Sequence, residues 1–241
     1  MLEKLPESVG HALINQRAGM DHVVYNQLFR LRATARLDVR STAFTFNAQL
    51  PVRFTADGDG VSPPLAWDGV PEGTESVALI VEDADSPTPH PLVHAIVVNL
   101  GNSAGAIEEG ALDSPDHVGI GLATGTNSFF KRAWLPPDPP RGHGVHRYVF
   151  QVFALGRPAQ SGGAPDLKTA ASGRASDTPM DTAAPGRRAF IEMVLERAVA
   201  VGCLIGTYER AQRVGSDEPE AAAEQAPVWV GIAKPSAIQA M

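Results

Sequence analysis

The chain has 241 residues, of which 44% are apolar, so it can bury the core of one large domain or two small ones. Lys and Arg number 20 against 27 Asp and Glu, and the net charge of -7 argues against a nucleic acid as partner. Cys203 is the only cysteine, which excludes an internal disulfide and favours a reducing compartment.

The first 40 residues predict a helical extension. Apolar residues recur at helical spacing from Leu5 to Leu13 and again from Met20 to Leu31, and Asp21 is suited to cap the second helix. We expect this stripe to be buried against the domain or a second subunit, with a membrane-surface helix as the alternative. The start lacks the apolar segment of a signal peptide, and no run is long enough to span a membrane. We therefore expect a cytoplasmic protein without a transmembrane segment.

Residues 41–212 predict one mainly β domain. Strand-like segments rich in Val, Ile and aromatics follow one another, among them "VALIVED" (77–83), "HAIVVNL" (94–100) and "RYVFQVFAL" (147–155). The connections are long and rich in Gly, Pro and Asp, without helical patterns between strands. This argues against a parallel βαβ fold and favours a mainly antiparallel sheet.

In the last third of the chain, segments with a clear apolar periodicity alternate with segments that lack one. Residues 156–186 hold few large apolar side chains and predict a flexible insertion within the domain. Residues 186–200 have a helical period, and "VGCLIGTYER" (201–210) predicts a returning strand. Residues 213–241 are expected to form a mobile acidic tail.

Two carboxylates and a histidine stand where a loop enters an apolar strand, in "DADSPTPHPLVHAIVVNL" (83–100). Asp83, Asp85 and His94 are suitable metal ligands, but their spacing matches no known metal motif, and no nucleophile elbow supports a hydrolase. A polar-ligand pocket at the rim of a sheet is one interpretation. The alternative is that the acids cap a turn and the histidine lies in the core.

A second histidine favours the pocket. His146 and Tyr148 begin a strand two positions apart, so they share a face while Arg147 points the other way. The prolines just before them, in "LPPDPPRG" (135–142), stiffen the neighbouring backbone. With Arg147 turned away, the positive charge for an anion would come from His94 or His146, favoured by Asp83 and Asp85.

At these residues the sequence resembles the phosphatidylethanolamine-binding proteins, and in particular their bacterial Raf kinase inhibitor-like branch. The resemblance rests on "DADSP" (83–87), "HAIVVN" (94–99) and "PPRGHGVHRYVF" (139–150), in that order, and extends over about residues 41–212. It implies a large antiparallel sheet packed on a smaller one with peripheral helices. Carried over by position, it implies a ligand pocket formed by Asp83, Asp85, Pro87, His94, Pro139, Pro140, His146 and Tyr148. Pro89 and Leu92 stand where the family often has a tyrosine and a tryptophan.

The resemblance implies a binding protein rather than an enzyme. Its ligand would be a phosphate- or carboxylate-bearing small molecule or a phospholipid head group, and its role would be regulatory, in the manner of a kinase or protease inhibitor. It implies no metal and no cofactor, and a homodimer is expected. The alternative is a small-metabolite isomerase or cyclase that uses the histidines as acid and base.

Overall fold

A computed structural model describes residues 7–31, 35–114, 123–158 and 185–210, and in these ranges the chain forms two β-sheets. The large sheet contains, in spatial order, β1 (Ala35–Arg36), β10 (Ala198–Tyr208), β9 (His146–Leu155), β5 (Ser76–Asp83), β6 (Leu92–Leu100) and β8 (Ala123–Thr124), with β3 (Ala48–Gln49) also paired to β10. The small sheet contains β2 (Asp38–Arg40), β4 (Leu65–Asp68) and β7 (Gly105–Ile107).

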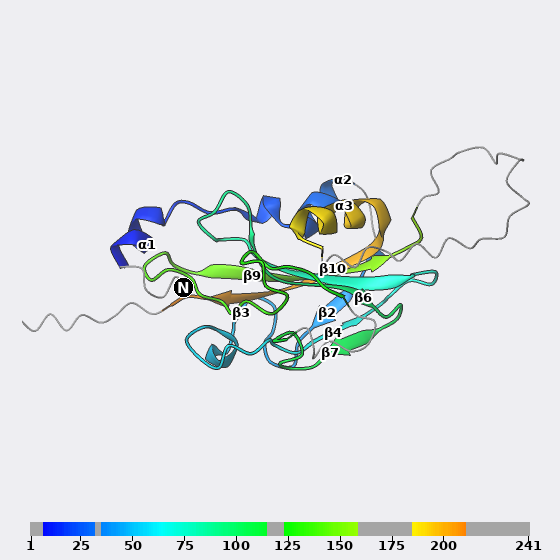
Figure 1. The fold of residues 1–241 in the computed structure, drawn as a ribbon, viewed down its shortest axis with the longest axis horizontal. Helices are drawn as coiled ribbons and strands as arrows, with labels where there is room; N and C mark the ends of the chain where they lie inside the picture. The colour runs from blue at the N-terminus through cyan, green and yellow to red at the C-terminus, as the bar shows by residue number, and fades with distance from the viewer. Residues whose placement is uncertain (1–6, 32–34, 115–122, 159–184, 211–241) are drawn as a thin grey trace, which may run out of the picture.

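The predicted fold class is confirmed. Within the described residues every strand pair is antiparallel except for the short strands β1 and β3, which pair parallel with β10. The helices are α1 (Glu7–Leu13), α2 (Val24–Leu31) and α3 (Arg187–Arg197), with 3-10 turns η2 (Met20–His22) and η3 (Val52–Phe54). In Figure 1 the three α-helices lie on one side of the large sheet and the small sheet on the other.

This layering explains why the central strands are apolar at nearly every position. Val77, Leu79 and Val81 of β5 belong to the core cluster shared with the small sheet. The alternate residues Ala78 and Ile80 pack in the cluster shared with α2 and α3. Because both faces of the strand are covered, a polar side chain on either face needs a partner.

The N-terminal segment differs in detail from the sequence-based expectation. Its helices extend only to Leu31, and residues 35–40 enter β1 and β2 instead of continuing the helical extension to residue 40. The expectation that Asp21 caps the second helix was wrong: it lies inside η2, whose N-cap is Gly19. Burial of the stripe is confirmed at Val24 and Leu28, which pack in the helix-side core, whereas Val9, Leu13 and Met20 are half-buried.

The expected tail at 213–241 and most of the expected insertion at 156–186 lie outside the described residues. Among the residues that are described, no helix has both the length and the apolar character that crossing a membrane requires.

Candidate functional site

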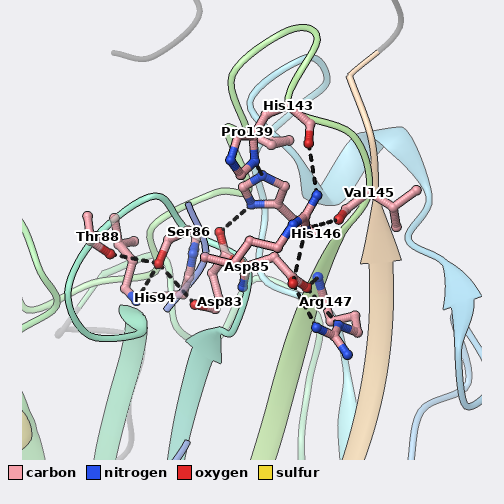
Figure 2. Close-up of polar contacts among 12 residues, drawn as sticks. Asp83, Asp85, Ser86, Thr88, His94, Pro139, His143, Val145, His146 and Arg147 are labelled. Carbon is pink, nitrogen blue, oxygen red and sulfur yellow. Dashed lines mark hydrogen bonds and ion pairs between the residues drawn. The ribbon is translucent and has the colours of Figure 1, made fainter. Parts of the chain in front are cut away.

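Strand pairing brings the acidic turn and the histidine segment together at one end of the large sheet. Asp83 ends β5 and pairs in register with Tyr148, close to the start of β9 at His146. In antiparallel neighbours the end of one strand lies beside the start of the next. Asp83, His94 and His146 therefore come from different strands and meet at the same end, as Figure 2 shows.

A β-bulge turns His94 toward this site. Val81 pairs with Ala95 but Glu82 pairs with Val93, so His94 is the extra residue on β6. Val93 consequently packs in the helix-side core, whereas Ala95 packs in the core shared with the small sheet. The His94 ring then contacts the ring of Tyr148, with centroids 5.1 Å apart.

Asp83, His146 and His143 form a buried hydrogen-bonded row. The Nδ1 atom of His146 lies 2.8 Å from Oδ2 of Asp83, and its Nε2 atom lies 2.6 Å from Nδ1 of His143. His143 is 0% exposed and His146 is 1% exposed, although both lie at or beside a loop. Burial, and then the neighbouring His146, lower the pKa of His143. His143 was not among the predicted site residues, and its one signal in the sequence was its place between two glycines in "GHGVH" (142–146).

Asp85 lies apart from this row. Arg147 donates to both of its carboxylate oxygens at 2.7 Å, and Arg17 lies 3.0 Å from Oδ1. Burial alone would raise the pKa of Asp85, but hydrogen bonds and charge from Arg147 and Arg17 together lower it. Arg147 does point away from Tyr148, as strand alternation predicts. Asp85 pairs with Arg147, whereas Asp83 pairs with His146, so the two predicted acids have different partners.

Three buried polar atoms on or beside His94 have no hydrogen-bond partner among the described residues. They are Nε2 of His94, the hydroxyl oxygen of Tyr148 and Nε1 of Trp134. The rings of His94 and Trp134 are 5.9 Å apart. Trp134 was not predicted, and it gives the site an aromatic side chain that the prolines and leucine around position 90 do not provide.

Burial sets the protonation of these groups. Nδ1 of His94 lies 2.5 Å from the carbonyl of Leu135 and therefore carries a proton. Burial lowers the pKa of His94, and the nearby Asp83 offsets this only in part. Asp83 thus favours the charged form of His94, as expected from the sequence, but burial outweighs its effect on the pKa. Burial, with Asp83 and Asp138, also raises the pKa of Tyr148 well above its usual range, so its hydroxyl stays protonated.

The predicted prolines lie around the site. Pro139 and Pro140 are buried, and Pro87 is half-buried beside the acidic turn. The Ser86 hydroxyl holds this turn by donating to the Asp83 carbonyl at 3.2 Å and accepting from the Leu92 amide at 3.2 Å. Two hollows, of about 370 and 480 Å³, lie away from His94 and Tyr148, and the second is lined by Arg17, Asp85 and Arg147 among others. Of the predicted residues, Asp83, His94, His146 and Tyr148 are buried, whereas Asp85 lines the second hollow.

Known proteins share both the sequence pattern and the fold. A family model described as phosphatidylethanolamine-binding protein matches residues 40–209. A UPF0098 protein from Aquifex aeolicus is 38% identical over 121 residues, covering 50% of this chain and 69% of the relative. A UPF0098 protein from Pyrococcus horikoshii is 30% identical over 175 residues, covering 70% of this chain and 75% of the relative.

Two crystal structures show the same architecture. Escherichia coli YbcL, described as a member of the mammalian PEBP family, superposes with a TM-score of 0.60 at 26% identity, covering 73% of this chain and all of YbcL. A PEBP homologue from Chlamydia trachomatis gives a TM-score of 0.56 at 26% identity, covering 74% of this chain and all of the homologue. With the strand order, the converging histidines and the match over residues 40–209, the chain belongs to the phosphatidylethanolamine-binding protein family.

Proposed function

We propose that the chain is a binding protein whose site takes a phosphate- or carboxylate-bearing small molecule, or the phosphate of a phospholipid head group. The observation that carries this proposal is the set of three buried polar atoms, on His94, Trp134 and Tyr148, that have no hydrogen-bond partner in the part of the chain that the structure describes. An unsatisfied buried polar group costs about 1–3 kcal/mol, so a ligand that supplies partners recovers that free energy on binding. The family's name supports a phosphate-bearing head group as one source of the ligand.

The three atoms can all hydrogen-bond to an anion if one additional proton is present, either on the anion or on His94. The Trp134 N–H and the Tyr148 hydroxyl can donate to ligand oxygens. Neutral His94 has its proton on Nδ1, so its free Nε2 accepts. Either the ligand donates a proton to Nε2, or His94 takes up a proton and then donates it. In both cases the complex holds one proton more than the free protein and the free ligand hold together at high pH.

Affinity is therefore expected to fall as pH rises. The complex needs one proton more than the separate components hold at high pH, so the limiting slope is about tenfold per pH unit. Calorimetric titration with phosphoethanolamine between about pH 5.5 and pH 8 measures it. Phosphoethanolamine itself loses a proton near pH 6. Ethyl sulfate, which does not titrate in this range, isolates the contribution of the protein.

A matched pair of variants tests whether the proton taken up on binding is held at His94. We expect His94→Gln to flatten the pH dependence for ethyl sulfate, because an amide cannot carry the proton. His90→Gln removes an exposed histidine on the loop before β6 and should leave the dependence intact. Constant affinity in the unaltered protein across this pH range, or a full slope in His94→Gln, would contradict the role given to His94.

The remaining features of the function stay predictions. They are the regulatory role, the homodimer, the cytoplasmic location and the enzymatic alternative with His94 and His146 as acid and base. Both ring nitrogens of His146 already have partners in Asp83 and His143. A role for His146 in proton transfer would therefore require that row to open first.

A further inference from the structure

We propose that residues 7–19, which we call the N-terminal strap, close the ligand site, and that a single proton shared along the row of Asp83, His146 and His143 holds the strap in place. This inference rests on the proposed function, because the strap regulates access to that same site. It concerns a segment outside the region that the family model matches, which begins at residue 40.

The strap is hydrogen-bonded to two loops beside the site, the acidic turn and the loop before β9. On the acidic turn, the amide of Ala18 donates to the carbonyl of Ser86 at 2.9 Å, and the amide of Gly19 donates to the carbonyl of Ala84 at 2.7 Å. On the loop before β9, the Arg17 guanidinium donates to the carbonyls of His143 at 2.9 Å and Val145 at 2.8 Å. The strap thus bridges two loops that are far apart in the sequence.

A glycine contact brings α1 against the second loop. A Cβ atom added to Gly10 would lie 1.8 Å from the carbonyl oxygen of Arg141, so only glycine permits this approach. On the facing side, Gly142 has a positive φ of 76°, and a Cβ there would lie 2.9 Å from the ring of His11. In Figure 1, α1 lies near the end of the large sheet where β9 begins.

The strap also covers the histidine row directly. Nε2 of His143 lies 2.8 Å from the carbonyl of Leu13 and 3.1 Å from the carbonyl of Gln16. These contacts help to explain why His143, at the centre of a glycine-rich loop, is 0% exposed. A ligand that approaches His146 from the His143 side has to displace the strap.

Hydrogen-bond chemistry determines the number of protons in the row. Carbonyl oxygens only accept, so Nε2 of His143 must carry a proton to bind Leu13 and Gln16. The contact between His143 and His146 needs a second proton, and the contact between His146 and Asp83 needs a third. An ionised Asp83 and two neutral imidazoles supply only two protons. The intact row therefore holds one extra proton and is neutral overall.

Loss or gain of a proton disrupts the row. When the extra proton is lost at high pH, two protons remain for three contacts. Either two nitrogen lone pairs then face each other between His143 and His146, or Nε2 of His143 faces the carbonyls of Leu13 and Gln16 without a proton. When a second extra proton is added at low pH, two N–H groups face each other at the same place. The charged and titratable groups nearby are Arg17 and Asp85 on the strap side, His11 and Arg141 at the α1 contact, and Asp138 and His94 toward the site. Burial, His146 and Arg17 lower the pKa of His143, whereas its contacts with the carbonyls of Leu13 and Gln16 raise it.

Hydrogen–deuterium exchange of the full chain tests the attachment of the strap without any ligand. We expect Gly10→Leu to raise the exchange of amides in residues 8–19 by about tenfold or more, because the added side chain forces α1 away from Arg141. Ala12→Leu adds a leucine to an exposed position of the same helix and should leave exchange unchanged. Equal exchange in the two variants would overturn the proposed strap contact.

The pH dependence of the same exchange tests the shared proton. After correction for intrinsic exchange rates, protection of residues 13–19 should fall as pH rises, with a limiting slope of about tenfold per pH unit for one proton. His143→Gln should abolish this dependence, whereas His11→Gln, which removes a histidine of the strap outside the row, should retain it. A dependence that survives His143→Gln, or disappears in His11→Gln, would overturn the proton-linked attachment.

Stopped-flow binding of phosphoethanolamine, followed by Trp fluorescence, tests closure. Trp134 lies beside His94 and is the expected reporter. Gly10→Leu should raise the association rate by about tenfold, and Ala12→Leu should not. An unchanged rate together with raised exchange would overturn the closing role of the strap. Absence of binding in every variant would instead contradict the proposed function, and the exchange experiments would then decide the attachment alone.

Discussion

Glu82, near the end of β5, has no exposed surface, and its carboxylate has three partners from different elements. It accepts from the amide of Val24 at 2.9 Å, from the side chain of Gln151 at 2.8 Å and from Arg187 at 2.7 Å. Gln151 in turn accepts from the amide of Tyr25 at 2.6 Å. A buried charge is tolerated only when it is paired and fully hydrogen-bonded, so this carboxylate ties α2 and α3 to β5.

Removing the charge of Glu82 is expected to destabilise the fold. Glu82→Gln leaves Arg187 without its counter-charge, which should lower the free energy of unfolding by about 2–4 kcal/mol. Glu75→Gln is the matched control, because Glu75 pairs with Arg157 and Arg197 at the surface, where a pair contributes up to about 1 kcal/mol. Urea denaturation measures both, and equal losses would contradict the structural role of Glu82.

At the scale of elements, two glycines of β10 allow neighbouring segments to approach the strand closely. It pairs with β9 along its length and with the short strands β1 and β3 on its other edge. A Cβ added to Gly202 would lie 2.4 Å from the carbonyl of Leu37, and one added to Gly206 would lie 2.4 Å from the side chain of Leu50. The missing side chains allow the chain around Leu37 and Leu50 to cross closely over the strand.

We therefore expect Gly202→Ala to force the segment around Leu37 away from β10. Overpacking of this kind costs about 1–3 kcal/mol, and the midpoint of urea unfolding should fall accordingly. Gly101→Ala provides the control, because no atom lies within 4 Å of a Cβ added there. If both variants unfold at the midpoint of the unaltered protein, the close crossing at Gly202 does not constrain the fold.

At the scale of the whole molecule, the N-terminal segment completes the layer above the large sheet. Val24 and Leu28 of α2 are fully buried and pack in a cluster with Phe153 of β9 and Phe190 of α3. Val23 packs in a neighbouring cluster with Ala84 and adjacent residues. The segment outside the matched family region is therefore part of the core.

Deleting residues 1–30 should consequently damage the fold. Exposure of the surface that Val23, Val24 and Leu28 cover should cost about 4–6 kcal/mol. For a protein of this size that lowers the Tm by about 10–20 °C. Deleting residues 1–13 removes only α1 of the strap and should lower the Tm by less than about 5 °C. Calorimetry measures both deletions, and similar Tm values for the two would show that α2 is not part of the core.

Much of the fold and part of the site followed from the sequence alone. The strands β5, β6, β9 and β10 and the helix α3 were predicted because apolar periodicity is a local property, readable in a window of about ten residues. Strand alternation alone placed His146 and Tyr148 on one face and Arg147 on the other. The order of the three motifs then identified the family, and with it the meeting of Asp83, His94 and His146.

Only the tertiary structure decided which groups those residues contact. The bond between His143 and Leu13 joins residues 130 positions apart, and that between Arg17 and His143 joins residues 126 apart. Folding likewise brings together Asp85 and Glu82 with their partners and places Trp134 beside His94. The lowered pKa of His94 also depends on the neighbours that bury it. Periodicity fixes which face a side chain occupies, but hydrogen bonding and desolvation depend on distances of a few ångströms between segments whose spacing only the packed layers set.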